Sequence, residues 1–286
     1  MAEIILFENG NFHGKHRHVY TTETNLNHND DNSFNDKTSS IVVLEGNWRL
    51  YRNADLNIPY APVLGPGLYS FVGNFDIEND QISSLQPTTD PATVHGATLN
   101  SHVILFEHSN FHGAHKHVFT AETNLNAPDD NYFNDKTSSI VVLEGNWRFY
   151  RNAGLSISYA PVLGPGLYPL VSDYGIENDQ ISSLRYTTEQ TTVRAAPANK
   201  HLILFEKENW RGAHKHVFQA EPNLNAPDDD SFNDNVWSLV VKSGMWELYR
   251  NANFDSDIQW VSGPSMYTYG QYISYDIRSL SSLKPY

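Results

Sequence analysis

The sequence of 286 residues contains no cysteine and only three methionines. The absence of cysteine excludes disulfides, zinc–thiolate clusters, iron–sulfur sites and a cysteine nucleophile. Basic residues are also scarce, because 19 Lys and Arg stand against 33 Asp and Glu, which gives a formal net charge of −14. Such a balance argues against binding to nucleic-acid phosphates and favours metal cations or basic partners.

Long hydrophobic runs are missing as well. The sequence has no stretch of about 18 apolar residues, so we expect no transmembrane helix. The N-terminal residues MAEIILFENGNFHG lack the basic region and the long apolar region of a secretory signal. We therefore expect a protein that is cytoplasmic or secreted without a leader.

A threefold repeat dominates the sequence. Phe7, Phe106 and Phe205 lie 99 residues apart in the similar segments LFENGNFHG, LFEHSNFHG and LFEKENWRG. Residues 35–53 recur at 134–152 with a single difference. A unit of this length is too long for a solenoid repeat and suits a small domain.

Two stretches rich in Thr, Ala and Pro separate the repeats, and we interpret them as linkers. The predicted organisation is a domain at residues 1–88, a linker at 89–100, a second domain at 101–187, a linker at 188–200 and a third domain at 201–286.

Each unit has the pattern of an all-β domain. Short runs such as EIILFE, SSIVVL and NWRLYR lie between clusters of Gly, Asn, Asp and Pro, and no segment of helical length shows a 3.6-residue period. A second symmetry lies inside each unit, where NDKTSSI at residues 35–41 is echoed by NDQISSL at 79–85. We predict that each domain is a sandwich of two Greek-key motifs.

Two signatures recur in order. An aromatic hairpin, aromatic-x4-aromatic-x-Gly, occurs once per unit at Phe7, Phe12 and Gly14, at Phe106, Phe111 and Gly113, and at Phe205, Trp210 and Gly212. The motif N/D-N/D-x-x-S/T-S occurs at residues 35–40, 79–84, 134–139 and 178–183. Together they resemble the βγ-crystallin superfamily, specifically its microbial calcium-binding members, and the resemblance implies three tandem βγ-crystallin-like domains.

The second hairpin of each unit departs from this pattern. Tyr51 and Leu56 are followed by Ile58 where the family has glycine, and Ser256 stands at the same place in the third unit. We expect this hairpin to take another shape.

An Asn-Asp-x-x-Ser-Ser loop offers the carboxylate, carbonyl and hydroxyl oxygens that Ca2+ prefers. The resemblance implies a crossed site. Each ion takes the fifth-position hydroxyl and third-position carbonyl of one motif, the second-position side chain of the other, and the carbonyl after the first hairpin aromatic. A single carboxylate per site, with water completing the shell, predicts modest affinity.

Carried over to this sequence, the resemblance implies two sites in each of the first two domains. In domain one the ligands are Glu8, Lys37, Ser39 and Asp80 at the first site, and Arg52, Gln81, Ser83 and Asp36 at the second. In domain two they are Glu107, Lys136, Ser138 and Asp179, then Arg151, Gln180, Ser182 and Asp135. Glu, Lys, Gln and Arg would contribute carbonyls.

Domain three has degenerate motifs. Its first site would need Trp237 and Arg278 as ligands, so we expect it to bind no calcium. Its second site keeps Arg250, Ser279, Ser281 and Asp234.

Other interpretations stay open. Asn, Asp and Ser in these loops also suit turns that hold no metal. The pairs His16 and His18, His115 and His117, and His214 and His216 each place two imidazoles on one face of a strand, which is an incomplete transition-metal site.

The sequence contains no G-x-S-x-G or H-E-x-x-H motif, and we predict no enzymatic activity. We predict a monomeric calcium-binding protein with calcium-dependent stability and a structural role in stress or dormancy, binding neither nucleic acid nor membrane. The alternative is a recognition module for a carbohydrate, a protease or a surface partner, in which calcium is only structural.

Overall fold

The computed structural model describes residues 1–27, 34–130, 133–226, 232–270 and 276–286. They divide into two compact units: residues 1–102 with 117–133 form the first, and residues 103–116 with 134–286 form the second. Within the described ranges the regular elements are β-strands and short 3-10 turns, which confirms the predicted all-β class. None of the described helices is long and apolar enough to cross a membrane.

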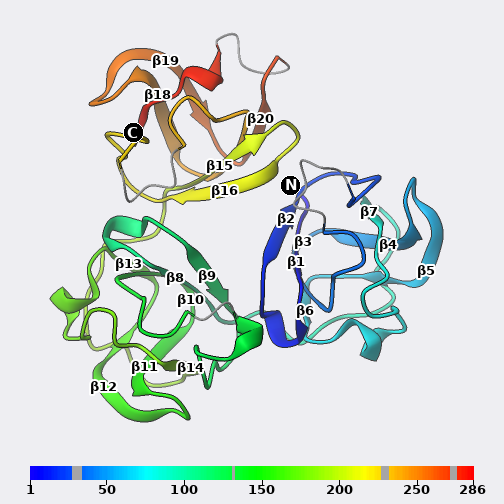
Figure 1. Ribbon diagram of the computed structural model, residues 1–286, viewed down its shortest axis with the longest axis horizontal. Helices are drawn as coiled ribbons and strands as arrows, with labels where there is room; N and C mark the ends of the chain where they lie inside the picture. The colour runs from blue at the N-terminus through cyan, green and yellow to red at the C-terminus, as the bar shows by residue number, and fades with distance from the viewer. Residues whose placement is uncertain (28–33, 131–132, 227–231, 271–275) are drawn as a thin grey trace. The chain divides into compact units, whose positions relative to one another are not determined.

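The first unit contains the two sheets of the first repeat (Figure 1). One sheet has the order β2-β1-β3-β6, built from β1 (Glu3–Phe7), β2 (His16–Val19), β3 (Ser40–Glu45) and β6 (Gly67–Tyr69). The other has the order β5-β4-β7, built from β4 (Asn47–Asn53), β5 (Asn57–Leu64) and β7 (Ser84–Thr88).

The two halves of this repeat are interlocked by backbone pairing. Strand β6 follows β5 in the chain but pairs with β3 of the other sheet. In return Glu23, between β2 and β3, bridges Leu85 of β7 through reciprocal backbone hydrogen bonds of 2.8 and 2.9 Å. Each sheet is thus joined to the other half, one through a strand and one through a single bridging residue, as expected for two interlocked Greek-key motifs.

The second and third repeats have the same topology. The second has sheet orders β13-β10-β8-β9 and β12-β11-β14, with β8 (His102–Phe106), β9 (His115–Val118), β10 (Ser139–Glu144), β11 (Asn146–Asn152), β12 (Ser156–Leu163), β13 (Gly166–Tyr168) and β14 (Ser183–Thr187). The third has orders β16-β15-β17-β20 and β19-β18-β21, with β15 (His201–Lys207), β16 (Arg211–Val217), β17 (Ser238–Ser243), β18 (Met245–Asn251), β19 (Asp255–Ser262), β20 (Ser265–Thr268) and β21 (Ser282–Pro285).

Short 3-10 turns connect the strands. They are η1 (Gly10–Phe12), η3 (Val72–Phe75), η4 (Ser109–Phe111), η5 (Pro128–Asp130), η6 (Val171–Tyr174) and η7 (Ile277–Ser279). The prediction of three tandem domains, each with two Greek-key motifs, is confirmed.

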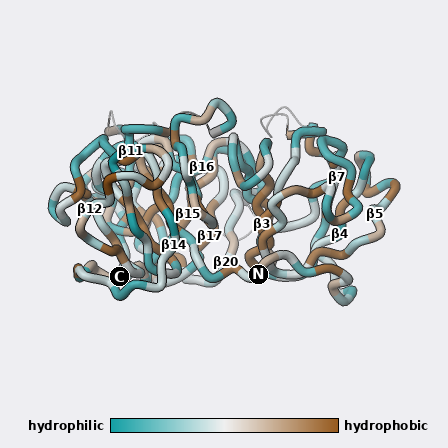
Figure 2. Tube along the Cα trace, turned by 90° about the horizontal axis from the view of Figure 1, so that it is seen from below, coloured by the Kyte–Doolittle hydropathy of each residue, from teal (hydrophilic) through white to brown (hydrophobic). Residues whose placement is uncertain are grey.

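The core of the first repeat lies between its two sheets. Ile4 and Leu6 of β1 pack in one cluster with Trp48 and Leu50 of β4, and all four are fully buried. The β3 run is also apolar, as its brown colour in Figure 2 shows. The opposite face of β1 is buried as well, because Phe7 packs in a second cluster that includes Phe119 of the same unit. A strand buried on both faces explains why EIILF does not alternate.

The second hairpin keeps the shape of the first, so the expectation of a different shape is wrong. The Leu56 amide donates to Ser84 Oγ at 3.1 Å, as the Phe12 amide donates to Ser40 Oγ at 2.9 Å. Ile58, at the position of the missing glycine, has a φ of 57°. The hydroxyl that anchors the hairpin is therefore retained, and a β-branched residue adopts the left-handed conformation that glycine adopts without strain.

The first predicted linker lies along the domain that precedes it. Leu68 and Ala97 exchange backbone hydrogen bonds of 2.8 and 2.9 Å, and the Gly65 amide donates to the Val94 carbonyl at 3.1 Å. A Cβ on Gly96 would lie only 2.5 Å from the Leu68 carbonyl oxygen, so this close approach requires glycine. These contacts fix the chain as it leaves the domain.

Candidate metal-binding loops

The paired motifs of the first repeat meet through two crossed hydrogen bonds. Ser39 Oγ donates to Asp80 Oδ1 at 3.1 Å across 41 residues of chain, and Ser83 Oγ donates to Asp36 Oδ1 at 3.1 Å across 47 residues. The strand exchange brings these loops together. Each hydroxyl thus faces the carboxylate that the resemblance assigns to the same ion.

Each motif carboxylate has a second donor and an unusual backbone. Asn35 Nδ2 donates to Asp36 Oδ2 and Asn79 Nδ2 donates to Asp80 Oδ2, both at 2.7 Å. Asp36 and Asp80 have φ values of 54°, and the same value recurs in the other repeats at Asp135, Asp179 and Asp234. Aspartate tolerates this left-handed conformation better than most residues. The five motif aspartates thus share one backbone conformation.

Residues that would supply carbonyls to the first site lie beside Ser39. The Ser39 amide donates to the Phe7 carbonyl at 2.9 Å, which places the next residue, Glu8, at the loop. Lys37 Nζ lies 3.8 Å from Glu8 Oε1. Glu8, Lys37, Ser39 and Asp80 are therefore brought together.

The second site has a similar frame. The Ser83 amide donates at 3.1 Å to the carbonyl of the residue before Arg52, and Arg52 Nε lies 3.2 Å from Glu78 Oε2. The Tyr60 hydroxyl donates to the Gln81 carbonyl at 3.2 Å. Burial, followed by the negative charge of Glu78, raises the pKa of Tyr60 to about 12. The phenol therefore stays a donor to Gln81 at neutral pH.

The second repeat reproduces these contacts within the second unit. Ser138 Oγ donates to Asp179 Oδ1 at 2.9 Å and Ser182 Oγ donates to Asp135 Oδ1 at 3.2 Å. The flanking contacts are also retained: Lys136 with Glu107 at 3.8 Å, Arg151 with Glu177 at 3.4 Å, and the Tyr159 hydroxyl with the Gln180 carbonyl at 3.1 Å.

The first site of the third repeat is filled by a cation of the chain itself. The Arg278 guanidinium lies 5.1 Å from the centre of the Trp237 ring and 4.3 Å from that of Tyr269, which is a cation–π arrangement. Two 2.7 Å hydrogen bonds join it to Asp276, and this bonding lowers the pKa of the Asp276 carboxyl. Trp237 and Arg278 offer no side-chain oxygen to a metal.

The second site of the third repeat keeps its backbone frame. The Asp234 amide donates to the Leu280 carbonyl at 3.1 Å, and the Ser281 amide donates at 3.0 Å to the carbonyl before Arg250. Ser279 differs, because it lies in η7 and its hydroxyl donates to the Asp276 carbonyl at 2.8 Å.

Sequence reasoning did not identify Tyr60 and Tyr159, which hold the carbonyls of the second sites. A signal was present, since NIPYAPVL and SISYAPVL carry a tyrosine at the same place. That tyrosine lies on an exposed stretch of strand, where a phenol has no obvious structural role before the loop contact is known.

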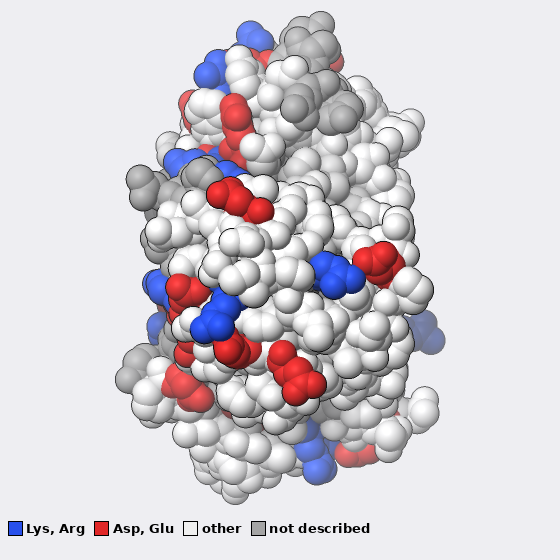
Figure 3. Space-filling view, turned by 90° about the vertical axis from the view of Figure 1, so that its right-hand side faces the viewer, with Lys and Arg blue, Asp and Glu red and all other residues white. Residues whose placement is uncertain are grey.

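Charge is dispersed on the face drawn in Figure 3, where acidic and basic groups lie side by side and neither sign forms one large patch. The strong net negative charge is therefore not concentrated into a single docking surface on this face. The carboxylates with a defined geometry are those of the motif loops, which accept hydrogen bonds from the motif serines.

Interlocked Greek keys with paired Asn-Asp-x-x-Ser-Ser loops define a class of tandem two-motif β-sandwich proteins. A model of the Beta/Gamma crystallin family matches residues 3–88, 102–187 and 201–286. The chain belongs to this family, which confirms the resemblance seen in the sequence.

Known relatives share parts of the chain. A Beta/gamma-crystallin of Ciona intestinalis is 35% identical over 30% of this chain and 98% of its own length. The human Beta/gamma crystallin domain-containing protein 1 is 28% identical over 76% of this chain, which spans only 9% of that protein. Among solved structures, a transition-metal-ion-binding betagamma-crystallin from Methanosaeta thermophila is 39% identical, with 30% of this chain and 99% of that chain covered and a TM-score of 0.27.

Proposed function

We propose that this protein is a non-enzymatic calcium-binding βγ-crystallin whose stability depends on Ca2+. The observation that carries the proposal is the crossed hydrogen bond between a motif serine and the aspartate of the other motif. It occurs four times, with distances between 2.9 and 3.2 Å. Hydroxyl and carboxylate oxygens at this spacing suit a hard cation.

Each ion would join the two Greek-key motifs of one domain. Because the ligands come from loops far apart in the chain, the unfolded state has no comparable site. Binding to the folded state alone stabilises it by RT ln(1 + [L]/Kd), about 2.7 kcal/mol per site at a hundredfold excess over Kd. Calcium would thus stabilise small domains that have no cysteine for disulfides.

The proposed ligands are those carried over from the motifs. In domain three we propose a single site at Asp234, Arg250, Ser279 and Ser281, because Arg278 and its two aromatic partners occupy the other position. The chain would then bind five calcium ions with modest affinity.

Calorimetric titration with Ca2+, paired with thermal unfolding in calcium and in chelator, tests this function. We expect calcium heats and a rise in Tm of about 10–20 °C for each occupied site, the size that ~2.7 kcal/mol produces in a domain of this length. Asp90→Asn is a matched control, since Asp90 pairs with Arg49 away from the loops. Absent heats together with an unchanged Tm would refute the proposal.

A second candidate, recognition of a carbohydrate, is favoured by one exposed aromatic pair. The rings of Trp260 and Tyr286 lie 4.8 Å apart with 42% and 75% of their surface exposed. Sugars stack on such rings, so Trp260→Ala should abolish binding on a glycan array if this function holds. A glycan array with no hit for the parent protein would eliminate it.

A further inference from the structure

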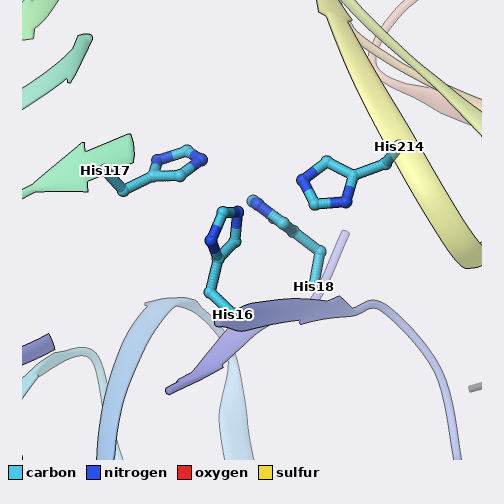
Figure 4. Close-up of side chains that lie close together, drawn as sticks. All are labelled: His16, His18, His117 and His214. Carbon is cyan, nitrogen blue, oxygen red and sulfur yellow. The ribbon is translucent and has the colours of Figure 1, made fainter. Parts of the chain in front are cut away.

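The His-x-His pairs acquire a third imidazole in the structure. In the first unit His16 and His18 project from one face of β2 toward His117 of β9 (Figure 4). The ring centres of His16 and His117 are 4.8 Å apart and those of His18 and His117 are 5.2 Å apart. One ring nitrogen from each residue lies within 4.8 Å of the others.

A comparable trio lies in the second unit. His115 Nε2 is 3.1 Å from His214 Nε2, and the ring centres of His115 and His216 are 4.8 Å apart. These three residues also offer nitrogens within 4.8 Å of one another. In both units the trio joins residues of two consecutive repeats.

We propose that each trio binds one divalent transition cation, with Zn2+ as the representative ion. Three imidazoles and a water give the four-coordinate geometry that zinc adopts when one position is open. Neutral imidazole suits zinc, copper and nickel, whereas calcium prefers oxygen ligands. The sites are therefore chemically separate from the Asp and Ser loops, and the inference does not rest on calcium binding.

Buried partners orient these rings as in many metal centres. His18 Nδ1 lies 3.0 Å from Glu3 Oε1, and His117 Nδ1 lies 2.8 Å from His102 Nε2. A hydrogen bond at Nδ1 directs coordination to Nε2 and fixes the ring plane. In the second unit His216 Nδ1 lies 2.8 Å from His201 Nε2.

The arginine of β2 does not belong to the imidazole face. Arg17 lies between His16 and His18 on β2, so its side chain points to the opposite face of the strand. There Arg17 Nη2 donates to Glu23 Oε2 at 2.7 Å. The basic residue between the two histidines is thus explained by a buried ion pair and does not repel the proposed ion at close range.

The hydrogen-bond partners of the two trios differ in charge. Glu3 supplies a carboxylate to the first, whereas His201 stands at the equivalent strand position in the second. A carboxylate raises the basicity of the ligating imidazole and offsets part of the ion's charge, and such partners change affinity by about 10–100-fold. We expect the first trio to bind Zn2+ more tightly by a factor of this size.

Calorimetric titration of the full chain with Zn2+ in saturating Ca2+ tests the proposal. We expect two ions per chain with separate affinities. His16→Asn should remove the tighter one and His115→Asn the weaker one, and both positions are only partly buried, so folding is preserved. His95→Asn, at an exposed histidine of the first linker, is the matched control and should leave both ions bound.

Imidazole nitrogen NMR gives a readout that a purely structural role would not move. Zinc should shift the Nε2 resonances of His18 and His117 and leave their Nδ1 resonances in the hydrogen-bonded range. Zinc binding that calcium displaces would assign the ion to the Asp and Ser loops and overturn the proposal. Two ions retained in the folded His16→Asn and His115→Asn variants would overturn it as well, as would an absence of binding.

Discussion

Ser39 Oγ and Asp80 Oδ1 lie 3.1 Å apart although they belong to different motifs, and Ser83 and Asp36 repeat the relationship at the same distance. If each Ser–Asp pair binds its own calcium ion, Asp80→Asn should remove the first site of domain one and keep the second. Asp36→Asn should do the reverse. Calcium calorimetry should therefore lose one ion in each variant and two in the double variant. Loss of both domain-one ions in a folded single variant would contradict the crossed assignment.

The Arg278 guanidinium over Trp237 predicts that a lost site can be rebuilt. Trp237→Ser with Arg278→Asp restores the hydroxyl and the carboxylate of the motif. The double variant should bind one more calcium ion than the parent protein, while each single variant should gain none. Without calcium it should be less stable than the parent protein, because the cation–π contact is lost. A folded double variant with unchanged calcium stoichiometry would refute the idea.

Ile58 has a φ of 57°, which is a strained conformation for a β-branched residue. Because 52% of its surface is exposed, burial of its side chain stabilises the fold little and does not offset this strain. A left-handed conformation costs an L-residue about 1–2 kcal/mol, and the added freedom of glycine in the unfolded chain offsets about 0.5–1 kcal/mol. Ile58→Gly should therefore raise the free energy of unfolding by roughly 0.5–1 kcal/mol, measured in urea. Ile58→Ala keeps the strain and serves as the control, and an equal gain in that variant would rule out strain relief.

Three tyrosines predict how stability changes at alkaline pH. Burial raises the pKa of Tyr60, Tyr159 and Tyr168 to about 12, from about 10 in an unfolded chain. The folded state thus holds these protons more tightly. The resulting stability is complete below pH 10 and is lost as pH rises through about 12. Melting temperatures should fall across this window, and the fall should be shallower in Tyr60→Phe. An alkaline absorbance titration in which Tyr60→Phe loses amplitude near pH 10 rather than near pH 12 would contradict the shift of Tyr60.

Local patterns in the sequence were sufficient to predict the class of fold. The recurrence of residues 35–53 at 134–152, with the paired Asn-Asp-x-x-Ser-Ser motifs, indicated tandem domains with two motifs each. The family resemblance also paired Ser39 with Asp80, and the structure places these two residues in contact. The motifs were informative because the hydrogen bonds of these loops are formed by the Asn, Asp and Ser side chains of the motifs themselves.

Contacts between segments remote in sequence could not be predicted in the same way. The absence of glycine at Ile58 suggested a different hairpin, but the Ser84 hydroxyl imposes the original shape on the Leu56 amide. His117 joins His16 and His18 only because separate repeats pack within one unit. Spacing within a strand carries no information about a partner that arrives from another repeat.

The exchange of β6 between sheets has a consequence for how this chain folds. Strand β6 lies in the segment APVLGPGLY, and the same nine residues recur at 160–168, while SSIVVLEG recurs as its pairing partner. A misassembled molecule in which β6 pairs with β10 would form the same local contacts, so local energetics do not distinguish the two outcomes. Chain entropy favours the correct one, because the connection from β3 to β6 is shorter than the one from β6 to β10 and a shorter loop costs less to close. The separation of identical repeats along the chain therefore serves the fidelity of folding.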